Sequence, residues 1–141
     1  MTYELYSGDW EGHYSYGPAY SERRRKTKVG FLIKMSFQGD VLNGTCEEFI
    51  TKVHMGRSAV LSGRMDGDKI WFVKQYPCFF EFDEHEGIHL DRSRDAYPVH
   101  YTGTFHPTLG VFSGDWRISR PSEEGSAESD PFSGSWEMWK I

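Results

Sequence analysis

The sequence has few cysteines and lacks the patterns that build metal sites from them. Cys46 and Cys78 lie far apart with no C-x-x-C pair, so we expect two buried free thiols. No apolar run approaches the ~20 residues that a membrane-spanning helix needs. The first residues have neither the basic nor the apolar segment of a signal peptide. These absences argue against a secreted or membrane-spanning protein, and we expect a cytoplasmic one.

Charge and composition narrow the class of protein further. The net charge of −5 means that the chain on average repels nucleic acid and anionic membranes, so we expect neither as a partner. Aromatic residues make up 16% of the chain and glycines number 15, a combination that favours β structure. The length suits one domain, and we expect residues 1–141 to form it.

Helical periodicity is missing, and apolar and polar residues instead alternate in short segments that end in turn residues. Alternation points every second side chain to the same side, so each segment has one apolar face. The pattern predicts eight strands, at residues 8–17, 29–38, 41–50, 57–65, 68–76, 98–106, 110–119 and 132–141.

A short motif, apolar-x-Gly-x-apolar, recurs in six places. The copies are Tyr6-x-Gly8-x-Trp10, Leu42-x-Gly44-x-Cys46, Leu61-x-Gly63-x-Met65, Tyr101-x-Gly103-x-Phe105, Phe112-x-Gly114-x-Trp116 and Phe132-x-Gly134-x-Trp136. Glycine inside a strand is destabilising, so its recurrence needs a reason. In a small, strongly coiled barrel, an inward glycine lets the strand bend and lets a neighbour's ring cross it. We therefore predict a closed barrel, with an open sandwich as the alternative.

The lengths of the connections predict the topology. Gly39-Asp40, Asp66-Gly67 and the segment 107–110 are tight hairpin links, whereas the links at 18–28, 51–56, 77–97 and 120–131 are long. In an up-and-down meander these two kinds alternate between the ends. The fold class is thus all-β: a closed antiparallel up-and-down barrel of about eight strands, with long loops at one end and tight hairpins at the other. The tight turns place Phe37 opposite Leu42 and Gly63 opposite Ile70.

This phase points aromatic side chains and two charges into the half of the barrel below the long loops. Such a lining is typical of a small-molecule pocket, which would need a cavity of about 300 Å³. The predicted ligand-binding residues are Tyr14, Tyr16, Phe31, Glu48, Lys74, Tyr76, Tyr101, Trp116 and Phe132. Inward charges need partners, so Lys74 and Glu48 either pair with each other, or Lys74 holds a ligand carboxylate. The alternatives are that both charges face solvent, or that the aromatic residues simply fill the core.

The opening Gly8-x-Trp10 and the closing Gly134-x-Trp136 resemble the calycin group of barrels: lipocalins, fatty-acid-binding proteins and avidins. The resemblance implies a Trp10 that packs across the closed end, and binding inside the barrel without a named ligand. The stretch 7–12 also looks like the opening of nitrobindin-type haem barrels, whose iron ligand is a histidine near the C-terminus. Here the last histidine is His106, so haem is not implied. The lipocalin C-terminal helix and an avidin-type biotin set have no counterpart.

Residues His85-Glu86-Gly87-Ile88-His89 match H-E-x-x-H, the zinc motif of metalloproteases. That motif works on a helix, where both imidazoles share a face. Here a glycine interrupts it and an aromatic, strand-like stretch precedes it. In an extended segment at ~3.3 Å per residue the two histidines are too far apart to chelate one ion. We therefore expect no metal and no cofactor.

A basic run, Arg23-Arg24-Arg25-Lys26, lies in the long loop at 18–28. It is typical of a solvated loop, although such a run also attracts phosphate or an acidic partner. The acidic segment 122–130 lies in another loop at the same end, so the two loops are expected to neutralise each other in part.

We expect this protein to bind a small apolar or aromatic ligand in the loop-bearing half of the barrel. One alternative is a protein-interaction module with a solid core, which would use the long loops or outward Trp71 and Trp139. A further alternative is an enzyme with Lys74, Glu48 or an inward tyrosine as acid or base. No catalytic pattern supports it, since the inward Cys46 has no histidine beside it. The oligomeric state stays open.

Overall fold

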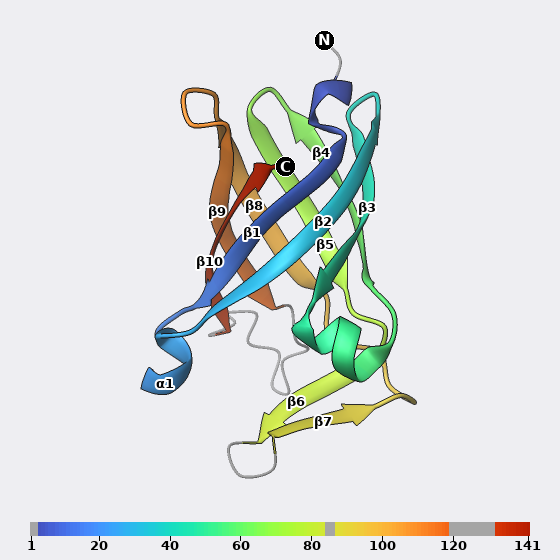
Figure 1. Ribbon diagram of the computed structural model, residues 1–141, viewed down its shortest axis with the longest axis vertical. Coiled ribbons are helices and arrows are strands. Elements are labelled where there is room, and N and C mark those ends of the chain that lie inside the picture. Colours follow the sequence, from blue (N-terminus) through green and yellow to red (C-terminus); the bar gives the residue numbers. More distant parts are fainter. Residues whose placement is uncertain (1–2, 84–86, 119–131) are drawn as a thin grey trace, which may run out of the picture.

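Eight strands close into an antiparallel barrel in the computed structural model, which describes residues 3–83, 87–118 and 132–141 (Figure 1). The barrel strands are β1 (Gly8–Tyr16), β2 (Lys28–Gln38), β3 (Val41–Glu48), β4 (Ala59–Asp66), β5 (Lys69–Gln75), β8 (Val99–His106), β9 (Val111–Ile118) and β10 (Ser133–Lys140). Each pairs with the next barrel strand along the chain, so β5 pairs with β8, and β1 pairs with β10 to close the ring. The predicted up-and-down barrel is confirmed, and the open sandwich is wrong.

Smaller elements decorate the two ends. A 3₁₀ helix, η1 (Glu4–Tyr6), lies at the end with the tight turns. At the other end lie α1 (Glu22–Arg25), a π-helical turn η2 (Ile50–Met55), and a separate hairpin of β6 (Phe79–Asp83) and β7 (Gly87–Asp91), which lies below the barrel in Figure 1. Among the described residues, no helix has the length and apolar character that a membrane crossing requires.

Two sequence expectations at this end need correction. The segment 77–97 was expected to be a loop, but it contains the β6–β7 hairpin. The strand expected at 41–50 ends at Glu48, because the Thr51 hydroxyl accepts from the Glu48 amide and donates to the Glu48 carbonyl, each at 2.9 Å. These bonds turn the chain towards η2, so residues 49 and 50 do not continue the strand.

The tight turns set the register, with one difference from expectation. Gly39-Asp40 joins β2 to β3 and puts Phe37 opposite Leu42, as predicted. Between β4 and β5 the two-residue turn is Gly67-Asp68, since Asp66 still pairs with Lys69. Gly63 therefore lies opposite Phe72 and not Ile70. A shift of two residues keeps every side chain on its face, so the inward set is unchanged.

Two of the motif glycines, Gly103 and Gly134, make room for tryptophan rings from neighbouring strands. A Cβ added at Gly134 would lie 2.6 Å from Nε1 of Trp116, and one at Gly103 would lie 2.6 Å from Cζ2 of Trp136. The Trp116 indole crosses Gly134 and donates to the Ser15 carbonyl at 3.0 Å. The motif thus packs rings against bare backbone where β8, β9, β10 and β1 meet.

The end with the tight turns is plugged by aromatic side chains. Trp10 is 2% exposed, and its indole donates to the Tyr6 carbonyl in η1 at 2.8 Å. The Trp10 and Tyr6 rings both pack against Phe112, with centroids 5.1 and 5.4 Å apart, and Tyr6 also packs on Phe105 at 5.0 Å. Space inside the barrel is therefore found at the opposite end.

Candidate functional site

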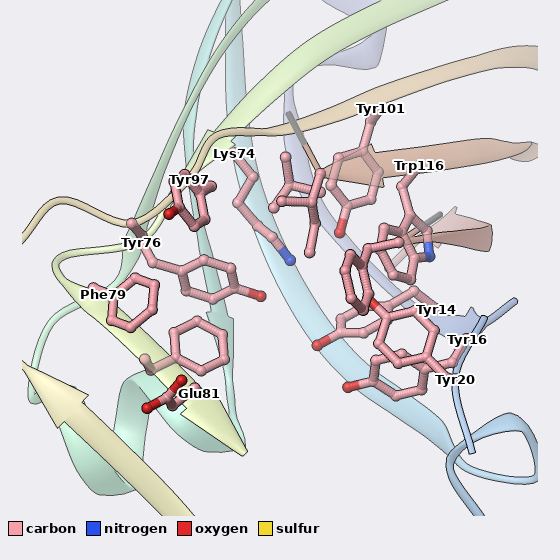
Figure 2. A pocket seen from close by; sticks show the side chains of 15 residues that line it. Tyr14, Tyr16, Tyr20, Lys74, Tyr76, Phe79, Glu81, Tyr97, Tyr101 and Trp116 are labelled. Carbon is pink, nitrogen blue, oxygen red and sulfur yellow. The ribbon is translucent and has the colours of Figure 1, made fainter. Parts of the chain in front are cut away.

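A cavity of about 210 Å³ lies between the open end of the barrel and the β6–β7 hairpin (Figure 2). Its wall is mostly aromatic, and its one amine comes from β5. The lining residues are Tyr14, Tyr16, Tyr20, Lys74, Tyr76, Phe79, Phe80, Glu81, Ala96, Tyr97, Val99, Tyr101, Trp116, Ile118 and Phe132. The volume is below the expected 300 Å³, but cavities of about 150 Å³ already hold benzene. The space therefore suits a ligand built on one ring.

Seven of the nine residues predicted for the ligand site line this cavity: Tyr14, Tyr16, Lys74, Tyr76, Tyr101, Trp116 and Phe132. Phe31 does not line it and instead stacks on the Tyr14 ring, with centroids 6.4 Å apart. Glu48 does not line it either, because its carboxylate lies behind the side chains that form the cavity floor.

Sequence reasoning missed eight lining residues: Tyr20, Phe79, Phe80, Glu81, Ala96, Tyr97, Val99 and Ile118. Two of them carried a usable signal, because alternation puts Val99 on the face of Tyr101 and Ile118 on the face of Trp116. Tyr20 lies in the link between β1 and α1, and the other five lie in the hairpin or in the link that follows it. These residues lie outside the barrel strands, so strand alternation does not show which of them face the barrel, and no local pattern predicts that they cover the cavity.

Lys74 and Glu48 form a buried ion pair beneath the cavity. Both face inward, with side chains 2% and 1% exposed, and Lys74 Nζ lies 3.1 Å from Glu48 Oε2. Both positions follow from strand alternation, since Lys74 shares the inner face of β5 with Ile70 and Phe72. The sequence left two arrangements open for these charges, and the structure shows the one in which they pair with each other.

Further donors surround the carboxylate. Oε1 of Glu48 accepts from the Tyr14 hydroxyl at 2.9 Å and from the Tyr76 hydroxyl at 2.7 Å. The Cys46 thiol points to Oε2 at 4.0 Å. A buried carboxylate is tolerated only when its lone pairs are used, and these four donors occupy both oxygens. The ammonium in turn lies over the Tyr14 and Tyr76 rings, 4.7 and 4.6 Å from their centroids.

Burial keeps the tyrosine hydroxyls and the thiol of this cluster protonated. It raises the pKa of the Tyr14 and Tyr76 hydroxyls well above the usual value, and the negative charge of Glu48 raises both pKa values further. Burial also raises the pKa of the Cys46 thiol to about 12. On Lys74, burial alone favours the neutral amine, but the Glu48 carboxylate, Tyr101 and Cys46 together outweigh it and the pKa rises. At neutral pH the cluster holds one ammonium, one carboxylate and neutral hydroxyls.

Among the described residues, the inner wall of the cavity therefore presents hydrogen-bond donors and no carboxylate. Burial raises the pKa of Tyr101 more than the neighbouring Lys74 lowers it, so this hydroxyl is a donor as well. Among the described lining residues, the one carboxylate is Glu81, which is exposed at the rim. Such a wall can hold an acceptor atom but has no group placed to abstract a proton.

The described part of the H-E-x-x-H segment belongs to no metal site. His89 lies on β7, so this part of the motif is extended, as predicted, while His85 and Glu86 fall outside the described residues. Within the described ranges, no three His, Cys, Asp or Glu side chains are grouped so that they could hold an ion.

The other singled-out features lie away from the cavity floor. The basic run forms α1, where Lys26 pairs with Glu22 at 3.1 Å and Arg24 lies 5.8 Å from the centroid of the Tyr16 ring. Its expected acidic partner, the loop at 120–131, lies outside the described residues. Both cysteines are buried free thiols, as predicted. Trp71 is 42% exposed, and Trp139 donates to Glu11 on the outer face at 3.0 Å.

At a coarse level the closed eight-stranded antiparallel barrel agrees with the calycin-like architecture that the two Gly-x-Trp sequences imply. That agreement concerns strand number, pairing and closure. A scan against protein-family models, a search of curated proteins and a search of solved structures each found no match to this chain.

Proposed function

We propose that the protein binds a small, largely aromatic molecule in the cavity at the open end of the barrel. The observation that carries the proposal is a cavity of about 210 Å³ whose wall combines aromatic rings with one buried ammonium. Apolar area supplies affinity in such sites, and a few fixed polar groups orient the ligand. The cavity volume limits the ligand to one ring with a short substituent.

The two other functions find less support in the geometry. An interaction module needs a filled barrel and a continuous exposed apolar patch, whereas this barrel has internal space at one end. An acid–base enzyme needs a base that reaches the substrate. Here Glu48 is held by four donors behind the floor, and the hydroxyls that face the cavity are held neutral by burial.

Filling the cavity tests the proposal. Ala96 lines it and is 6% exposed, so Ala96→Phe should place a ring where the ligand would lie. Val60→Phe is the matched control, because Val60 is 59% exposed on the outside of β4. We expect saturable binding of monosubstituted benzenes by the wild type and by the control, detected by ligand-observed NMR and by tryptophan fluorescence, and none by A96F. Equal binding by A96F, or no binding by the wild type, would overturn the proposal.

A further inference from the structure

Two buried donors face the cavity with hydrogen-bonding capacity that the protein does not use. An ammonium has three N–H groups. Glu48 Oε2 takes one of those on Lys74, and among the described residues the other hydrogen-bonding neighbour of the amine is the Tyr101 hydroxyl. The Tyr101 hydroxyl, 3% exposed, has no acceptor of its own within the described ranges. Figure 2 shows the Lys74 nitrogen and the Tyr101 oxygen pointing into the same space.

The acceptors near this point are already occupied. Glu48 is the buried carboxylate of the cluster, and its two oxygens receive hydrogen bonds from Tyr14, Tyr76 and Lys74. The inner end of the cavity is thus rich in donors and poor in acceptors. A ligand that brings an acceptor satisfies two buried donors that are costly to leave unpaired. A ligand that brings a donor leaves them unpaired and finds there only tyrosine hydroxyl oxygens to receive it among the described residues.

The charge of the cluster also favours uncharged ligands over charged ones. Lys74 and Glu48 neutralise each other 3.1 Å apart, so the floor carries no net charge. An anionic ligand would lose its hydration and approach the Glu48 carboxylate as well as the ammonium. A cationic ligand would meet the ammonium directly. An uncharged acceptor pays neither cost.

We propose that the ligand is an uncharged carbonyl compound built on one ring, whose oxygen accepts hydrogen bonds from Lys74 Nζ and the Tyr101 hydroxyl. This inference rests on the proposed function and adds the chemical class of the ligand. The ring would lie among the aromatic side chains that line the rest of the cavity, including Tyr16, Trp116 and Phe80.

Three probes of similar size separate the contributions of shape, acceptor and charge. Acetophenone carries a neutral acceptor, isopropylbenzene has the same shape without one, and benzoate carries a charged one. We expect acetophenone to bind about fivefold or more tightly than isopropylbenzene, because it gains two hydrogen bonds of modest net value. Benzoate should bind more weakly than acetophenone at pH 7.5. Dissociation constants come from NMR titration or calorimetry with the full chain.

Removing one hydroxyl tests the contact itself. Tyr101→Phe keeps the ring and should weaken acetophenone binding about three- to tenfold, with isopropylbenzene changed less than about twofold. Tyr3→Phe is the matched control, since the Tyr3 hydroxyl accepts from the Gly67 amide at the opposite end of the barrel. That variant should leave the affinities for all three probes unchanged.

The outcomes separate this inference from the proposed function. If acetophenone and isopropylbenzene bind equally and Y101F changes neither, the cavity binds ligands but the carbonyl inference is overturned. Tightest binding by benzoate overturns it in favour of an anionic ligand. If the wild type binds none of the probes, the proposed function fails together with the inference.

Discussion

Replacing Lys74 by Met should destabilise the protein more than any other single change in the ligand site. Methionine has nearly the length of lysine, so the substitution removes the charge while largely preserving the volume. Glu48 then remains 1% exposed without its counter-ion. Its hydrogen bonds from Tyr14 and Tyr76 stay in place, but neutral hydroxyls compensate a buried carboxylate only in part.

The expected cost follows from that geometry. Breaking a buried ion pair by removing one partner typically costs about 3–5 kcal/mol, a large part of the stability of a small domain. Replacing both charges avoids the cost, so Glu48→Gln combined with Lys74→Met should lie within about 1 kcal/mol of the wild type.

Urea unfolding followed by tryptophan fluorescence and circular dichroism measures these differences. The wild type, both single variants and the double variant complete a double-mutant cycle. If K74M loses less than about 1 kcal/mol, or if the double variant is as unstable as K74M, the ion pair is not the interaction that makes the buried charges tolerable.

Two further predictions concern alkaline pH and the motif glycines. Because the pKa values of Tyr14 and Tyr76 are raised on folding, stability should be intact below about pH 10 and fall above it by about 1.4 kcal/mol per pH unit per group; a flat urea midpoint up to pH 11 would contradict this. Gly134→Ala should cost about 1–3 kcal/mol, because its Cβ would meet the Ser15 carbonyl oxygen and the Trp116 ring, whereas Gly30→Ala, with nothing nearer than 3.9 Å, should be nearly neutral in thermal unfolding.

Much of the barrel was predictable because its signals are local. The tight link Gly39-Asp40 sets the pairing of β2 with β3, and alternation then assigns a face to every residue in both strands. The same logic predicted that Lys74 and Glu48 point inward. Because a lone buried charge is unfavourable, it also gave their pairing as one of two arrangements. These inferences need only strand periodicity and turn length.

What the sequence did not predict depends on contacts between distant segments. Phe79 and Phe80 are adjacent aromatic residues that fit a strand, but nothing in their spacing says that β6 pairs with β7 outside the barrel and covers its open end. The turn at Gly67-Asp68 was displaced by one position, because both Asp66-Gly67 and Gly67-Asp68 are good turn sequences and only the pairing of Asp66 with Lys69 decides between them.

The pairing of β1 with β10 has a consequence for how the chain folds during synthesis. Until β10 has left the ribosome, β1 and β9 each expose an unpaired edge, and the Trp116–Ser15 hydrogen bond must wait to join positions 101 residues apart. Exposed edges pair readily with other chains, so the nascent protein is most vulnerable to aggregation just before its last strand emerges. These two edges stay exposed until β10 pairs with both β1 and β9.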